Sequence, residues 1–100
     1  MTYSVRLGPS ARRDRDRILA WYDVEAPEQS ERFVKDLYST AEQLETFPRL
    51  RPVIRRGARR ISLEVFPYQL WYRVRDDAAI VQVIAVLHHR QDSSQIGLRV

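Results

Sequence analysis

Two histidines and an arginine give this chain its clearest potential for chemistry. His88, His89 and Arg90 follow one another at the end of the apolar run Ile80–Leu87. Histidine titrates near neutral pH and could transfer a proton, while Arg60 and Arg90 could hold a phosphate. Because metal-free cleavage of RNA needs these two functions, the set could form a ribonuclease site. The alternative is that both histidines lie at an exposed strand end and have no catalytic role.

Metal and cofactor chemistry finds little support in the sequence. The chain has no cysteine, and therefore no disulfide and no thiolate nucleophile or ligand. Its three glycines, Gly8, Gly57 and Gly97, are isolated and do not form a phosphate-binding loop. His88 and His89 are adjacent, and adjacent strand residues point to opposite faces, so they cannot easily share one metal ion. We therefore expect no cofactor and no metal.

Arginine dominates the charge of the chain. The net charge is +4, and Lys35 is the only lysine among 17 basic residues. Six arginines fall between Arg49 and Arg60, where Pro48, Pro52 and Gly57 prevent a continuous helix. Arginine pairs bidentately with carboxylates and phosphates, and single-sign clusters are uncommon without a partner. The loop therefore predicts an acidic partner, either a nucleic acid or a polypeptide, unless it serves solubility alone.

The candidate binding surface joins this basic loop to the polar side of the strands that follow and to the last basic cluster of the chain. Its members are Arg55, Arg56, Arg59, Arg60, Trp71, Arg73, Arg75, His88, His89 and Arg90.

Three apolar-rich runs must position these side chains. They are Ile61–Phe66, Leu70–Val74 and Ile80–Leu87, and short connections separate them. Such connections favour antiparallel neighbours, so we expect a three-stranded meander. The first two runs alternate apolar and polar residues, which predicts a sheet that is exposed to solvent on one face. The last run is apolar on both faces and is expected to be the most buried strand.

The first half of the chain predicts a strand and two helices. Tyr3–Leu7 alternates like a short strand, and Ser10 is the expected N-cap of a helix that starts at Ala11. The charged residues from Arg12 to Arg17 are expected on the solvent side of this helix. Pro27 is expected at the first position of a second helix that continues at helical spacing to Phe47. The two helices would form a hairpin.

These elements predict one domain, residues 1–100, of the α+β class. The expected order is β-α-α-β-β-β, with the helical hairpin packed on one face of an antiparallel sheet and the other face left for function. The tail Ser93–Val100 is weakly patterned and is a candidate mobile segment. No apolar run approaches the length of a membrane span, and the start lacks the pattern of a secretion signal, so we expect a cytoplasmic protein.

The joint pattern from Tyr3 to Asp92 resembles the RelE/ParE superfamily. These proteins are the toxins of bacterial type II toxin–antitoxin modules and are also called plasmid stabilisation proteins. The most specific part of the resemblance is Tyr68–Arg73, followed by the ending Val86–Asp92. No single motif is diagnostic, but the joint order is, and the expected order of elements agrees with the fold of this superfamily.

The resemblance implies one of two activities. The RelE-like branch cleaves messenger RNA in the ribosomal A site with basic residues on the exposed sheet face, whereas the ParE-like branch inhibits DNA gyrase. Gln69 and Ser62 stand where the nuclease pattern would carry basic residues, and no tyrosine follows Tyr72. The ending His-x-Arg-Gln-Asp is also more ParE-like. The expected function is therefore a growth-arresting toxin that binds gyrase and is not an enzyme.

Two alternatives remain open at this point. One is a RelE-like ribosome-dependent endoribonuclease that uses Arg60, His88 or His89, and Arg90. The other is a non-toxic module for nucleic-acid or protein interaction. Either toxin branch implies a cognate antitoxin whose acidic C-terminal segment wraps the toxin and folds on binding. DNA would then be contacted only through the antitoxin, and no membrane partner is expected.

Overall fold

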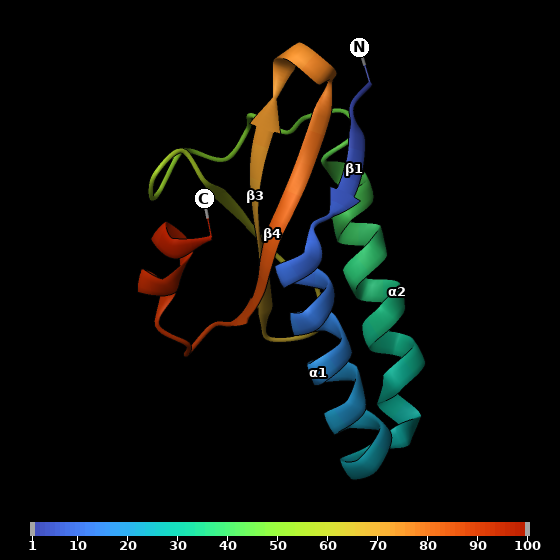
Figure 1. Ribbon diagram of the computed structural model, residues 1–100. Helices are drawn as coiled ribbons and strands as arrows, with labels where there is room; N and C mark the ends of the chain where they lie inside the picture. The colour runs from blue at the N-terminus through green and yellow to red at the C-terminus, as the bar shows by residue number, and fades with distance from the viewer. Residues whose placement is uncertain (1, 100) are drawn as a thin grey trace.

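The computed structural model describes residues 2–99 and confirms the predicted α+β class and order of elements (Figure 1). Two short 3₁₀ helices, η1 (Asp76–Ala78) and η2 (Ser93–Leu98), are added to the expected list. The main elements are β1 (Ser4–Leu7), α1 (Pro9–Glu25), α2 (Pro27–Gln43), β2 (Arg59–Ser62), β3 (Tyr68–Arg75) and β4 (Ile80–His88). Among residues 2–99, no helix combines the length and apolar character needed to cross a membrane.

The four strands form one mixed sheet in the order β1-β4-β3-β2. β3 runs antiparallel to β2 and to β4, as the short connections predict, and β4 is an interior strand as expected. β1 pairs with β4 in parallel, for example Val5 with Val81, so the prediction of a fully antiparallel sheet was wrong for this pair. The argument from short connections covers only consecutive strands, and β1 and β4 are the first and last.

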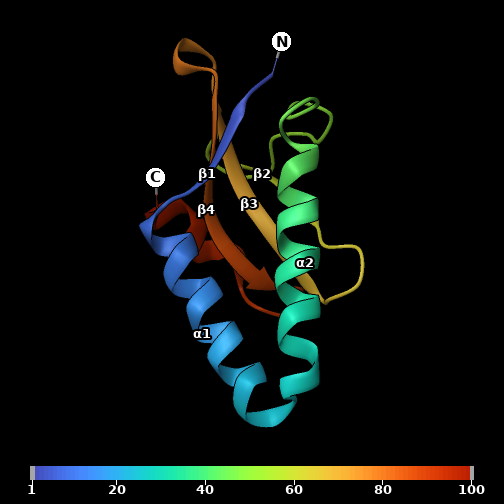
Figure 2. The same ribbon diagram turned by 90° about the vertical axis from the view of Figure 1, so that its right-hand side faces the viewer.

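α1 and α2 lie side by side on one face of the sheet, which confirms the predicted helical hairpin and its placement (Figure 2). The first hydrophobic cluster fills the space between them and the strands. Its fully buried members include Ala11, Phe33, Leu37, Leu44, Leu70, Tyr72, Val81, Val83 and Val86. This cluster fixes the sheet against the helices and therefore decides which strand residues face away from them.

The ends of both helices differ in part from the prediction. Pro27 begins α2 as expected, but Ser10 is not the N-cap of α1, because Pro9 already occupies the first position after Gly8. The Ser10 hydroxyl instead accepts a hydrogen bond from Arg13 (3.2 Å). α2 ends at Gln43 and not near Phe47, because the chain turns there and buries Leu44 in the core.

A buried carboxylate on α2 ends β2 earlier than predicted. Asp36 accepts hydrogen bonds from the backbone N–H groups of Glu64 (3.1 Å), Val65 (2.9 Å) and Phe66 (2.8 Å). These donors are therefore not available to a sheet ladder, and β2 stops at Ser62 where the sequence predicted a strand to Phe66. Val65, an apolar residue of the predicted strand, is 68% exposed.

Asp14 was expected on the solvent side of α1 but is buried. β1 ends at Leu7, so the edge of β4 is without a strand partner after Val83. Asp14 accepts a hydrogen bond from the Val86 N–H (2.9 Å) on this edge, and Arg99 donates both to Asp14 (2.6 Å) and to the Ile84 carbonyl (3.2 Å). The ion pair thus takes the place of a neighbouring strand and ties the end of the chain to the sheet.

The second face of the sheet is covered in part, which corrects the prediction of a bare, exposed face. A second hydrophobic cluster lies there under η2, and its members are Ala58, Trp71, Ile84, Ala85, Leu87 and Ile96. A β-bulge beside Trp71 and Tyr72 places both Ile84 and Ala85 in this cluster. The tail that was a candidate mobile segment therefore forms a packed 3₁₀ helix from Ser93 to Leu98, and Arg99 caps it; Val100 lies outside the described residues.

Candidate binding surface

Two residues of the possible ribonuclease site, Arg60 and His88, lie on opposite faces of the sheet. Arg60 pairs with Trp71 in the ladder, and its guanidinium lies 5.6 Å from the centre of the Trp71 ring, on the face covered by η2. His88 pairs with Tyr68, and their rings meet edge to face at 5.3 Å on the face covered by the helices. The sheet therefore separates His88, one of the two candidate proton-transfer groups, from Arg60, one of the two candidate phosphate-binding arginines.

Local hydrogen bonds occupy His88. The Nδ1 atom of its ring accepts a hydrogen bond from the backbone N–H of Arg90 (3.1 Å). The backbone N–H of His88 donates to the Gln91 side chain (2.7 Å), and these two bonds close the turn after β4. His89 is exposed, and its ring centre is 6.4 Å from that of His88. His88 is therefore part of a turn, while His89 and Arg90 extend into solvent at the end of β4.

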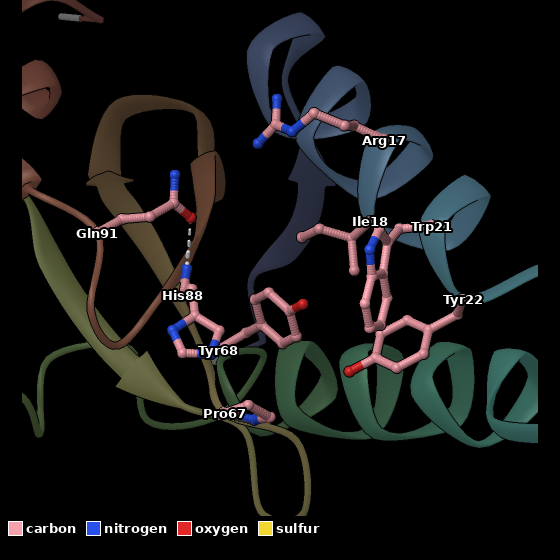
Figure 3. A pocket seen from close by; sticks show the side chains of 8 residues that line it. All are labelled: Arg17, Ile18, Trp21, Tyr22, Pro67, Tyr68, His88 and Gln91. Atoms are coloured by element: carbon pink, nitrogen blue, oxygen red, sulfur yellow. Dashed lines mark hydrogen bonds between the residues drawn. The ribbon is translucent and has the colours of Figure 1, made fainter. Parts of the chain in front are cut away.

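A hollow of about 480 Å³ lies between α1 and this end of the sheet (Figure 3). Aromatic side chains face one another across it, Trp21 and Tyr22 from α1 and Tyr68 from β3. Burial is the main cause that raises the pKa of the Tyr68 hydroxyl to about 12. A hydrogen bond with Tyr22 also raises this pKa, and the positive charge of Arg17 lowers it. Tyr68 is therefore protonated at neutral pH, and the hollow suits an apolar side chain better than a proton transfer. Its lining residues are Arg17, Ile18, Trp21, Tyr22, Pro67, Tyr68, His88 and Gln91.

A second hollow, of about 530 Å³, lies on the other face of the sheet and is lined by arginines. Arg73 donates to the carbonyl of Arg56, and its Nε is buried without a hydrogen-bond partner among residues 2–99. Arg75 is half exposed and lies 3.9 Å from Asp77, while Arg99 is already paired with Asp14. An arginine-lined hollow of this kind can hold a carboxylate or phosphate of a partner. Its lining residues are Gly57, Arg73, Val74, Arg75, Gln82, Ile84 and Arg99.

The loop arginines divide into structural and exposed ones. Arg59 points inward and donates to the carbonyls of Arg51 and Arg49, the second at 3.4 Å. Arg55 and Arg56 are exposed at the tip of the loop, and the Arg73 contact places Arg56 beside the arginine-lined hollow. The structure thus brings Arg73 and Arg75 together in one hollow, with the Arg56 backbone beside them, and leaves Trp71 and Arg59 to support the fold.

Sequence reasoning missed the exposed apolar side chains that accompany these arginines. Phe47, Leu50, Val53 and Ile54 are 60%, 69%, 51% and 45% exposed. Phe47 was expected to be part of α2, and the other three were not singled out. Their signal in the sequence is a mixture of apolar residues and arginines around Pro48 and Pro52, in a stretch that contains no carboxylate.

Comparison with known protein families identifies a match over most of the chain. A family model described as the ParE toxin of the type II toxin–antitoxin system parDE matches residues 5–93. A search of curated proteins found no significant match.

Solved structures of toxins share the fold. The chromosomal ParDE system of P. aeruginosa is similar with a TM-score of 0.67 and 22% identity, over 87% of this chain and 96% of that one. The RelBE2 toxin–antitoxin complex of Mycobacterium tuberculosis is similar with a TM-score of 0.58 and 25% identity, over 88% and 99%. A free RelE toxin of E. coli gives a TM-score of 0.57 and 22% identity, over 99% and 94%.

Proposed function

Because the chain belongs to the ParE family of toxins of type II toxin–antitoxin systems, we propose that it inhibits DNA gyrase by binding it. One observation carries the choice of a binding inhibitor over a ribonuclease. The sheet separates Arg60 from His88, so this histidine and Arg60 are not gathered around one phosphate. Arg73 and Arg75, in contrast, line one hollow on the second face and suit an acidic surface of a partner.

We also propose that a cognate antitoxin neutralises this toxin. Similar solved structures include the toxin–antitoxin complex RelBE2 and the intact RelBE complex of E. coli. An acidic segment of the antitoxin would pair with the exposed arginines, and an apolar side chain would fit the hollow between α1 and the sheet. Ordering such a segment costs part of the binding energy, so the free antitoxin would be open to proteolysis.

Two reactions with the purified chain test the activity. The chain is added to DNA gyrase supercoiling assays and, separately, to translating ribosomes. We expect inhibition of supercoiling and intact message. Codon-specific cleavage that is lost in His89→Ala would contradict the proposal and support the ribonuclease. No effect in either assay, with no growth arrest on expression, would support a non-toxic interaction module.

A matched pair of variants tests the arginine surface. Arg73→Gln with Arg75→Gln removes two charges from the second face, whereas Arg13→Gln with Arg32→Gln removes two exposed charges from the helices. We expect the first pair to weaken gyrase inhibition about tenfold, the scale of losing charged interface contacts, and the second pair to leave it nearly unchanged. Circular dichroism shows whether both pairs fold. Equal inhibition by the two pairs would remove the second face from the proposal.

A further inference from the structure

Apolar side chains are concentrated in one segment of the surface, residues 47–56, which we call the arm. Four of the nine large apolar side chains exposed in the described chain lie there: Phe47, Leu50, Val53 and Ile54. In Figure 1 the arm is the green to yellow-green coil that leads from the end of α2, behind β4 and β3, towards β2. Contiguous exposed apolar groups of this kind mark interaction sites on soluble domains.

The backbone of the arm is fixed by the rest of the fold. The Tyr72 hydroxyl donates to the Pro48 carbonyl at 2.7 Å in a buried contact. Arg49 forms an ion pair with Asp76 of η1, and Arg59 of β2 donates to the Arg51 carbonyl. The apolar side chains are therefore held outward by an ordered backbone. A preorganised surface loses less conformational entropy on binding than a flexible one.

The tip of the arm is a tight turn that keeps two arginines in solvent. The Ala58 N–H donates to the Arg55 carbonyl (2.8 Å), and Arg56 and Gly57 have positive φ angles of 47° and 77°. Two successive residues with positive φ are typical of the short turns that join hairpin strands. Ala58 is buried in the second cluster, so the turn presents Arg55 and Arg56 from a fixed base.

The charge of this region selects the kind of partner. No carboxylate occurs from Thr46 to Leu63, and Arg55 and Arg56 form no ion pair among residues 2–99. Two hollows of about 280 and 370 Å³ flank Phe47 and Leu50 and can each receive a side chain. A matching surface therefore has carboxylates opposite the arginines and apolar side chains opposite the hollows.

We propose that the arm docks onto an acidic protein surface of DNA gyrase, with Leu50 and Ile54 as apolar anchors and Arg55 and Arg56 as charge partners. This inference rests on the proposed function and names the part of the toxin that holds its target. Apolar anchors surrounded by a charged rim are the usual arrangement of a protein–protein interface.

The test compares exposed apolar residues inside and outside the arm. Leu50→Ser with Ile54→Ser changes the arm, and Val24→Ser with Val65→Ser changes residues that are 79% and 68% exposed elsewhere. Each full-length chain is titrated into supercoiling reactions of the gyrase holoenzyme, and thermal unfolding shows that it is folded. We expect the half-inhibitory concentration to rise about tenfold or more for the arm pair and less than about twofold for the other pair.

Several outcomes would overturn this inference. If wild type and the arm pair inhibit equally, the arm is not the gyrase contact, although the proposed function stands. If wild type does not inhibit gyrase, both fail. Mobility shifts with the same plasmid and sedimentation with phosphatidylglycerol vesicles test other occupants. Loss of DNA or vesicle binding in the arm pair, with inhibition unchanged, would assign the arm to that ligand instead.

Discussion

At the scale of single residues, Asp36 shows how one carboxylate can end a strand. It is buried and accepts three backbone hydrogen bonds from the turn between β2 and β3. Asp36→Ala would leave the buried Phe66 N–H and the partly buried Glu64 and Val65 N–H groups without this partner, so we expect a loss of about 3 kcal/mol in the free energy of unfolding in urea. Glu42→Gln removes an exposed carboxylate from the same helix and is the control. Equal stability of the two variants would show that water replaces the carboxylate.

Tyr68 gives a second prediction at this scale, in the dependence of stability on pH. Burial raises its pKa from the ordinary value of 10.0 to about 12, with a further contribution from Tyr22. The unfolded chain therefore loses the Tyr68 proton before the folded chain does. The resulting stabilisation is present below pH 10 and is lost as the pH rises towards 12. Between pH 10 and pH 12, the free energy of unfolding should fall less steeply in Tyr68→Phe than in the wild-type chain. Equal falls in the two chains would contradict the assignment.

At the scale of elements, η2 acts as a cover for the second face of the sheet. Ile96 is buried against the cluster that contains Trp71, whereas Leu98 of the same helix is 89% exposed. Ile96→Ser should expose Trp71, because it removes the apolar group that η2 places over it. Acrylamide quenching of tryptophan fluorescence, in a Trp21→Phe background, reports this exposure. Leu98→Ser is the control and should leave the quenching unchanged. If the quenching were also unchanged in Ile96→Ser, Trp71 would be covered by other residues.

The sequence predicts the elements whose signals are local. Helical spacing after Pro27, the alternation in β3 and the apolar run of β4 all act over a few residues, and all three elements form where they were expected, apart from the earlier end of α2 at Gln43. The cover of the second face depends instead on contacts between distant parts of the chain. Asp14 joins Val86 and Arg99, which are 72 and 85 residues away. A charged residue in a charged segment gives no signal of such burial, so Asp14 was placed on the solvent side.

The candidate site was predictable in composition but not in arrangement. Its arginines are visible in the sequence, and those at 55, 56, 73 and 75 do lie on the surface around the second face or its hollow. The placement of His88 on the helix side follows from the register of β3 and β4, which pairs it with Tyr68. That register shifts at a β-bulge beside Trp71 and Tyr72, and the alternation of residues in the sequence did not place this bulge.

At the scale of the whole molecule, charged and apolar contacts of the toxin should affect different steps of binding. The net charge is +4, and the exposed arginines attract an acidic partner over distances that salt shortens, about 10 Å at 0.1 M and 3 Å at 1 M. Apolar contacts act only after docking and are not screened. Charge complementarity therefore controls the association rate, and apolar anchors control the dissociation rate.

Binding kinetics on immobilised gyrase test this division. For the wild-type chain, raising the salt from low concentration to about 0.5 M should slow association several-fold and leave dissociation nearly unchanged. Arg55→Gln with Arg56→Gln should flatten the salt dependence of association, because it removes unpaired charges from the tip of the arm. Leu50→Ser with Ile54→Ser should keep that dependence and speed dissociation. If both pairs changed the same rate, the arginines and the apolar anchors would have to act in one step of docking.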